Sequence, residues 1–463
     1  MNFLKNIFAS KSKNFIIVSI LSQGFSFIIS MFIWAKFTLN DFVLLVNIEI
    51  ITLAISSFFG ISTDQFILRN YHEYEKIDRK VVIFNSWLIN WVSVIFILFF
   101  AFLIINIFNI KNENVIFFSI LSAGLTYFSQ IPFILIRFES NFKDYLKYNI
   151  FTVLFKMIFV YYFVIKDMNG VGSYYKGMCI FSLLIIPWYI LYLYNRSVLE
   201  FKWSIQKLII KFSLPIIPST LLSNFTPIIT RLILQTFGTK LLIAQFGLIN
   251  KLTSPITALQ NALRVLFVPQ VVLEDNKEIK SKNLEFISLK YFSILLFFSS
   301  IFALISNNLI TLFFNKSLKN IDNLYLFVVS VFLSNIYTYL SLGIFLARKN
   351  NYFWIPVLSQ ILIMFFPGIY LIKNYGLEGM LITEILKFLF YLLSGFILSK
   401  IFYNYPKKIL IFIKPILSAC LILFIFNLLE LYLYLYLIFL LKFIFIIYIS
   451  IIFFKKYLTT NIF

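Results

Sequence analysis

Long apolar stretches follow one another along almost the whole chain, and this succession constrains the fold more than any other feature. A bilayer core is about 30 Å thick, so a helix needs roughly 20 apolar residues to cross it. About fourteen runs of this kind are bounded by charged or turn residues: 14–35, 42–60, 81–108, 114–136, 146–165, 172–195, 208–235, 241–268, 291–314, 323–347, 353–372, 377–400, 409–429 and 432–454. Glu49 interrupts the second run, and the last two nearly join at Glu430. The pattern predicts an all-α, polytopic membrane protein with 12 to 14 transmembrane helices.

The composition supports a membrane protein but leaves the charge to be explained. The chain is 61% apolar and 13% charged, whereas soluble domains carry about a quarter charged residues. Its 40 Lys and Arg against 19 Asp and Glu give a net charge of +21. Such an excess is typical of proteins that meet nucleic acid, a membrane surface or an anionic substrate. The positions of the charges along the chain must therefore decide which of these partners applies.

Most of the positive charge follows the membrane topology. With the N-terminus inside, 25 basic residues lie in the inner segments, 8 in the outer ones and 7 within spans. Basic residues accumulate on the cytoplasmic side of membrane proteins, so we expect a multi-pass protein of the inner (cytoplasmic) membrane with both termini cytoplasmic. The first run is too long for a cleaved signal and is expected to stay as a helix. No nucleic-acid partner is expected.

Short similarities suggest an internal duplication. Arg137-Phe-Glu-Ser-Asn-Phe142 follows the fourth span, and Arg348-Lys-Asn-Asn-Tyr352 follows the tenth. Gly170-Val-Gly172 opens the sixth span, and Gly376-Leu-Glu-Gly379 opens the twelfth. Two six-helix halves are a common transporter architecture. We therefore expect lobes at residues 1–200 and 201–403, followed by two additional helices in 404–463; chance similarity in a chain rich in Asn, Lys and Phe is the alternative.

Signals of catalysis are nearly absent. The single histidine, His72, lies in a predicted cytoplasmic loop, so neither a histidine-based metal site nor a Ser-His triad can be built. Cys179 and Cys420 fall inside apolar runs without CxxC spacing, which favours buried, reduced thiols. The chain has no P-loop. We expect no catalytic residues, no metal and no cofactor, and thus a protein that is not an enzyme.

Ionisable residues at membrane depth are costly, and they usually face a water-filled cavity or each other. Basic groups prevail at that depth: Lys156, Arg231, Lys251 and Lys442, against Glu49 and the pair Glu384 and Lys387. Lys156, Arg231 and Lys251 are candidates for a cationic substrate cavity; snorkelling, or pairing with Glu49, is the alternative for Arg231 and Lys251. Glu384 and Lys387 are three residues apart and are expected to neutralise each other.

Other candidates lie near the inner ends of spans. Arg69 and Arg264 could meet an anionic group such as a phosphate there, because a guanidinium donates two hydrogen bonds to phosphate oxygens, and positive-inside anchoring is the alternative. Asp64 could pair in a gate or bind a cation, or be an ordinary loop carboxylate. Glu49 could serve coupling or gating, and Pro215 and Pro218 could bend the seventh span.

Polar residues gather in the first and seventh spans. They could hydrogen-bond the hydroxyls of a polar substrate, or they could pack helices against one another. The first span carries Ser19, Ser22, Gln23, Gly24, Ser26 and Ser30, and the seventh carries Ser219, Ser223, Asn224 and Thr226.

Several short motifs resemble one family of transporters. They are Phe59-Gly-Ile-Ser-Thr-Asp-Gln-Phe-Ile-Leu-Arg69-Asn-Tyr71, Lys211-Phe-Ser-Leu-Pro215-Ile-Ile-Pro218-Ser219, Arg231, the turn near Gly238 and Gly376-Leu-Glu-Gly379. Together with the span pattern they resemble bacterial polysaccharide flippases of the multidrug/oligosaccharidyl-lipid/polysaccharide exporter superfamily. Many relatives place an acidic residue before the arginine, but Thr230 stands there in this chain. The departure raises the question of what compensates Arg231.

The resemblance implies a flippase that moves undecaprenyl-diphosphate-linked oligosaccharide repeat units by alternating access, for O-antigen or capsule synthesis. Its expected partners are this lipid-linked substrate, membrane lipids, and a polysaccharide polymerase with its chain-length machinery. A cation-coupled multidrug antiporter of the same superfamily is one alternative. A membrane-embedded polysaccharide polymerase or glycosyltransferase is another, although the predicted outer loops are too short for the large loop that such enzymes generally carry.

Overall fold

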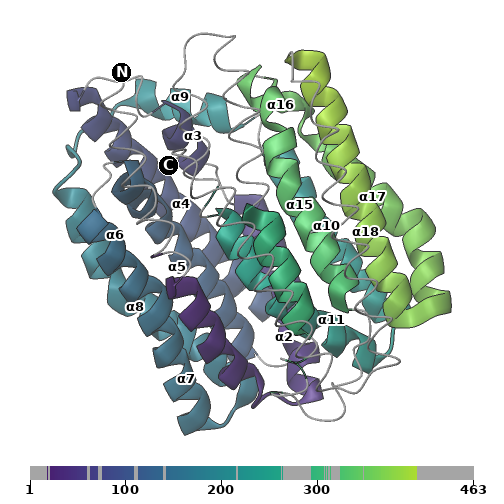
Figure 1. Cartoon of the computed structure of the whole chain (residues 1–463). Coiled ribbons are helices and arrows are strands. Elements are labelled where there is room, and N and C mark those ends of the chain that lie inside the picture. Colours follow the sequence, from purple (N-terminus) through teal and green to yellow (C-terminus); the bar gives the residue numbers. More distant parts are fainter. Residues whose placement is uncertain are drawn as a thin grey trace, which may run out of the picture. The chain divides into compact units, whose positions relative to one another are not determined.

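The computed structural model describes residues 18, 21–59, 63–70, 76–108, 113–138, 142–214, 217–261, 263, 294–306, 308, 310, 313, 324–347 and 349–403. Within these ranges the only regular elements are helices (Figure 1). The contacts divide the chain into two compact units, Ile17–Gly247 and Leu248–Phe463, with Met1–Ile16 assigned to the second. The predicted spans 409–429 and 432–454 lie outside the described residues.

The first unit contains most of the described helices. They are Leu21–Trp34, α2 Leu39–Phe59, α3 Thr63–Asn70, α4 Lys76–Phe108, α5 Glu113–Phe138, α6 Phe142–Asn149, the π-helix η1 Ile150–Phe155, α7 Lys156–Asp167, α8 Gly170–Tyr194, α9 Trp203–Ser213 and α10 Ile217–Phe237. The next helix, α11 Lys240–Leu252, crosses the unit boundary. Helix α5 packs between α4 and α8, α7 packs along α8, and α2 packs along α10.

The second unit contains a helix at Ile294–Ser306, α15 Leu324–Leu340, α16 Leu342–Leu346, a short 3₁₀ turn Asn350–Tyr352, α17 Trp354–Ile363, the π-helix η3 Met364–Gly368 and α18 Ile369–Phe402. Helix α18 packs against α15 and α17. The unit boundary at Gly247 differs from the predicted lobe boundary at residue 200. The division into two six-helix lobes therefore stays a prediction.

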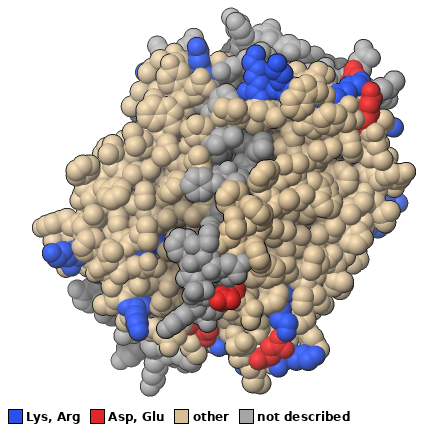
Figure 2. Space-filling model, turned by 180° about the vertical axis from the view of Figure 1, so that it is seen from behind, with Lys and Arg blue, Asp and Glu red and all other residues tan. Residues whose placement is uncertain are grey.

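The helices have the inverted polarity of a membrane protein. In α4, Asn85, Ser86, Asn90 and Ser93 are buried, whereas Val92, Ile95, Phe96, Phe99 and Phe102 are exposed. Lipid tolerates exposed apolar side chains, while backbone and side-chain polar groups need partners inside the protein. Figure 2 shows broad areas of one face without charged atoms. The protein is an all-α, multi-pass membrane protein.

Six helical stretches are long and apolar enough to cross a bilayer among the described residues: Asp78–Phe100, Glu113–Ile136, Lys143–Asp167, Gly170–Tyr194, Leu324–Ile344 and Trp354–Phe402. They coincide with the predicted third to sixth and tenth to twelfth spans. The last stretch has 49 residues, about 70 Å at helical rise and far more than one crossing. Gly376 interrupts it with φ 57° and ψ −123°, and α17 packs back on α18, which confirms two spans here.

The predicted start of the seventh span is wrong. Residues 208–213 belong to α9, a separate helix that ends at Ser213, and the long apolar helix α10 begins at Ile217. The hydropathy of Leu208, Ile209 and Ile210 continues that of the following span, so the sequence pattern did not separate the two helices.

Two backbone irregularities recur about 210 residues apart. Each unit has a π-helix, η1 before α7 and η3 before α18. The glycines that open the predicted sixth and twelfth spans, Gly170 and Gly376, are the glycines with positive φ in the described chain. Positive φ is strained for residues that carry a Cβ. The recurrence supports the internal duplication that the short sequence similarities suggest.

Candidate functional site

Arg231 forms an ion pair with Glu49. Its Nη2 donates to Glu49 Oε2 over 2.5 Å, which joins α10 to α2. The two side chains are only 10% and 20% exposed, so each charge is held where an unpaired ion would be costly. The pairing that the sequence offered as an alternative is thus what the structure contains. It also answers how Arg231 is compensated without an acidic neighbour at position 230.

The ion pair belongs to a row of polar contacts between α2 and α10, which we call the α2–α10 seam (Asn47, Glu49, Arg231 and Gln235). Gln235 Nε2 donates to Asn47 Oδ1 over 2.5 Å. The contacts run from Asn47 to Glu49 along α2 and from Gln235 to Arg231 along α10, and this opposite order is that of an antiparallel helix pair. Sequence analysis missed Asn47 and Gln235, although the one-turn spacing of Gln235 from Arg231 was a usable signal.

Two neighbouring residues complete the seam. Tyr175 of α8 is buried, and α8 packs against α2, the helix that carries Glu49. Thr230 is buried, and its hydroxyl donates back to the Thr226 carbonyl of its own helix over 3.0 Å. Arg231 Nη1 is buried without a hydrogen-bond partner among the described residues. The seam therefore neutralises the arginine while leaving one of its donor nitrogens unused.

Lys156 has a different environment. It is the first residue of α7, directly after the π-helix η1, and it is partly buried. No ion pair or hydrogen bond involves its ammonium group within the described ranges. Its helix contacts the first span on either side of it: Ser22 Oγ donates to Asn149 Oδ1 (3.3 Å), and Ser30 Oγ approaches Met157 Sδ (3.5 Å). Lys156 is thus a membrane-depth cation that no described carboxylate compensates.

The polar face of the first span packs against other helices. Ser22, Ser26 and Ser30 recur every four residues, and all three are buried. Ser30 also donates to the Ser26 carbonyl. Small hydroxyl residues of this kind let membrane helices approach closely. Helix packing, one of the two expected roles for these serines, is the role that the contacts support.

Lys251 is half-buried in the last turn of α11, and it takes part in a contact with a neighbouring group. It belongs to the second unit, whereas Arg231 and Lys156 belong to the first. Its proposed contribution to one common cavity stays a prediction.

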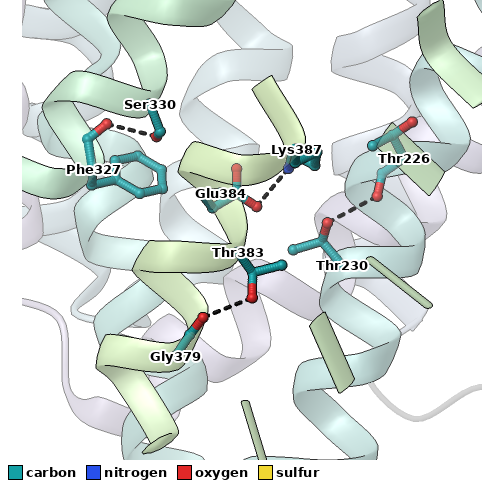
Figure 3. Close-up of polar contacts among 8 residues, drawn as sticks. All are labelled: Thr226, Thr230, Phe327, Ser330, Gly379, Thr383, Glu384 and Lys387. Atoms are coloured by element: carbon teal, nitrogen blue, oxygen red, sulfur yellow. Dashed lines mark hydrogen bonds and ion pairs between the residues drawn. The ribbon is translucent and has the colours of Figure 1, made fainter. Parts of the chain in front are cut away.

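Glu384 and Lys387 form the expected local pair. Lys387 Nζ donates to Glu384 Oε1 over 2.5 Å, and both side chains are at most 5% exposed. Figure 3 shows them pointing toward each other from one face of α18. The Lys387 ammonium also lies 4.6 Å from the centre of the Phe388 ring. The pair is self-neutralised inside the second unit, as the sequence predicted.

The remaining predicted residues are not tested by contacts. Pro218 is the second residue of α10 and is exposed; proline is tolerated in a first helical turn, so it begins the helix without bending its interior. Asp64 and Arg69 both lie in α3. Pro215, Arg264 and Lys442 lie outside the described residues. No cluster of three His, Cys, Asp or Glu side chains that could hold a metal ion occurs in the part of the chain that the structure describes.

Comparisons with known proteins identify the fold. No family model matches the sequence, and no curated protein matches it either. Solved structures do match over most of the chain. A MATE transporter in complex with MaL6 is 14% identical with a TM-score of 0.64, and the alignment covers 85% of this chain and 95% of that one.

Two further structures agree with this match. One is the outward-facing conformation of a multidrug resistance MATE family transporter of the MOP superfamily, with 15% identity, a TM-score of 0.61, and 84% and 95% of the two chains covered. The other is a variant of the Vibrio cholerae MATE transporter VcmN, with 16% identity, a TM-score of 0.59, and 85% and 97% covered. At such identities the likeness concerns the fold alone, and this chain has the fold of the MATE transporters.

Proposed function

We propose that this protein is a flippase for lipid-linked oligosaccharides whose headgroup carries a diphosphate. The observation that carries the proposal is the charge balance at membrane depth. Two carboxylates lie well within the predicted spans, Glu49 and Glu384, and both are ion-paired. Lys156 is left as a partly buried cation without a described partner. A site with an uncompensated cation attracts an anionic group and repels a cationic one.

The protein would work by alternating access. Its fold is that of transporters, one of which was solved in an outward-facing conformation. The diphosphate would occupy the polar interior near Lys156 while the polyprenyl tail stays in lipid. In that scheme the seam between α2 and α10 compensates the charge of Arg231 and holds the two helices together. The inner membrane, with cytoplasmic termini, is the proposed location, and a polymerase and its chain-length machinery are the proposed partners.

A cation-coupled multidrug antiporter is the second candidate, and the fold favours it at least as well. One of the matching structures is that of a multidrug resistance transporter. Such a protein would need a carboxylate able to exchange a cationic drug for a proton or another cation. Glu49 is the best-placed residue for that role, because it is more exposed than Glu384. Its pair with Arg231 would then have to open during transport.

The two candidates make opposite predictions in proteoliposomes that contain the full-length protein. Wild type should move a fluorescent polyprenyl-diphosphate oligosaccharide between leaflets, measured by bleaching with membrane-impermeant dithionite, and should leave ethidium untransported. Lys156→Met should slow the lipid movement at least about tenfold, which corresponds to roughly 1.4 kcal/mol, and Lys156→Arg should retain most of it.

Lys166→Met is the matched control, because Lys166 is an exposed lysine in the same helix. It should transport like wild type. Ethidium transport that depends on Glu49, together with immobile lipid-linked substrate, would replace the flippase proposal with the antiporter.

A further inference from the structure

Helix α9, Trp203–Ser213, is too short to cross a membrane. Its 11 residues span about 16 Å, half of a bilayer core. It lies across the end of α4 near α3, at the same end of the molecule (Figure 1). It directly precedes the membrane helix α10 in the chain. Such a helix can be covered by protein, lie in the membrane interface or face water.

One face of α9 is fixed to the first unit. Gln206, Ile209 and Ser213 are buried at helical spacing. Gln206 Nε2 donates to the backbone oxygen of Asn85 (3.0 Å) and to its side-chain oxygen (3.2 Å). Asn85 in turn donates to the Glu200 carbonyl (2.9 Å) and accepts the Lys202 N–H (3.2 Å). Because Asn85 and Gln206 are both buried, their hydrogen bonds give the helix a defined orientation on α4.

The opposite face combines exposed apolar and basic side chains. Trp203 is 66% exposed, Leu208 49% and Leu214 59%. Lys207 and Lys211 are exposed between them, one turn apart on the same side. In water this arrangement would leave a large aromatic and two leucines uncovered. Tryptophan and lysine together are instead typical of helices that lie at the boundary between headgroups and acyl chains.

We propose that α9 lies in the plane of the membrane interface and that Lys207 and Lys211 bind the headgroups of anionic phospholipids. Charge complementarity selects this occupant: two lysines beside an apolar surface are attracted to an acidic leaflet. The surface would hold the connection before α10 against the membrane while the Asn85 network holds it to α4. The inference is independent of the transported substrate and stands whether the protein moves lipids or drugs.

Quenching by brominated lipids tests the proposal on the full-length protein in nanodiscs. The chain has 6 tryptophans, so the signal of Trp203 is the difference between wild type and Trp203→Phe. Brominated phosphatidylglycerol should quench this signal with a relative association constant on the order of tenfold above that of brominated phosphatidylcholine. Lys207→Gln with Lys211→Gln should reduce the ratio to about one, with Trp203 still quenched by both lipids.

A charge-matched control separates a local site from general charge. Lys36→Gln with Lys240→Gln removes two exposed lysines elsewhere in the first unit and should keep the wild-type ratio. The proposal is overturned if Trp203 is quenched by neither lipid, because α9 would then face water or a protein partner. It is equally overturned if the ratio survives in the Lys207/Lys211 variant or is lost in the control.

Discussion

The helices around η1 in the first unit and those around η3 in the second share a backbone design but differ in charge. In both, a π-helix interrupts a membrane helix, and a glycine with positive φ opens the next one. The residue directly after the π-helix is Lys156 in the first unit and Ile369 in the second. In the second unit the following helix carries the closed pair Glu384–Lys387. The helix that follows the π-helix thus begins with a lysine that has no described ion-pair partner in the first unit and carries a neutralised pair in the second.

The origin of the two π-helices also differs. η3 contains Pro367, which lacks the N–H that an α-helix would use there. η1, with the sequence Ile-Phe-Thr-Val-Leu-Phe, contains neither proline nor glycine. π-turns inside α-helices are frequent at functional sites. The absence of proline and glycine from η1 fits the proposed role of Lys156, which directly follows it.

The largest effect on stability is expected from removing one member of the Glu384–Lys387 pair. Glu384→Ala leaves the Lys387 ammonium buried without a carboxylate, and we expect it to lower the free energy of unfolding by about 3–5 kcal/mol. Glu384→Leu combined with Lys387→Met removes both charges and should recover most of that loss. Reversible unfolding in mixed detergent micelles measures both. A double variant as unstable as the single one would show that the pair does more than neutralise itself.

Placing a charge directly after η3 in the second unit should lower the free energy of unfolding nearly as much. Ile369→Lys puts an uncompensated ammonium after η3, and we expect a loss of roughly 2.5–3.5 kcal/mol, the range found for inserting lysine at the centre of a membrane helix. Ile369→Met is the matched control and should change stability by less than about 1.5 kcal/mol. If the lysine were tolerated there without loss, the two copies would not differ in the way proposed.

Helix packing should be tighter around Gly395 in the second unit than around Gly177 in the first. A Cβ at Gly395 would clash with the ring of Tyr337, whereas one at Gly177 would lie 3.0 Å from Val160 Cα. Gly395→Ala is expected to cost about 1–3 kcal/mol, and Gly177→Ala less, because a small helix shift relieves it.

Gly24→Ala serves as the control for this series. Nothing lies within 4 Å of a Cβ at Gly24, and alanine favours a helix by up to about 1 kcal/mol. Thermal unfolding midpoints should therefore fall in the order Gly24→Ala, Gly177→Ala, Gly395→Ala. A reversed order of the last two would contradict the packing.

The smallest effect on stability should have the opposite sign. Lys156→Met removes a partly buried charge with no described partner, so we expect the protein to become more stable by about 1 kcal/mol while transport is lost. Lys166→Met should leave both unchanged. A destabilised Lys156→Met protein would mean that the lysine has a structural partner and would remove the argument for an open charge.

Local sequence patterns predicted much of this structure, but they could not predict contacts between residues that lie far apart in the sequence. The apolar runs located α4, α5, α8 and α15, because span length and hydropathy are properties of a single segment. The Glu384–Lys387 pair was predictable since its members lie three residues apart on one helix. The sequence did not decide which group compensates Arg231. Glu49 lies far from Arg231 in the sequence, and only the packing of α2 on α10 brings the two residues together.

Other features left no usable signal. The π-helix η1 has an ordinary helical sequence. The predicted seventh span joined part of α9 to α10, because both segments are apolar and both have lysines near their ends. Its separate role is visible only from the Gln206–Asn85 contact, which fixes one face and leaves Trp203, Lys207 and Lys211 on the other.

Equilibrium binding to the purified protein tests the central claim, that the open charge selects an anionic headgroup, most directly. Native mass spectrometry can compare undecaprenyl diphosphate, uncharged undecaprenol and the lipophilic cation tetraphenylphosphonium on wild type and Lys156→Met. Our account predicts that wild type prefers the diphosphate over undecaprenol by at least about tenfold, that Lys156→Met loses this preference, and that tetraphenylphosphonium binds neither. Preferred binding of tetraphenylphosphonium, or a diphosphate preference unchanged in Lys156→Met, would contradict it.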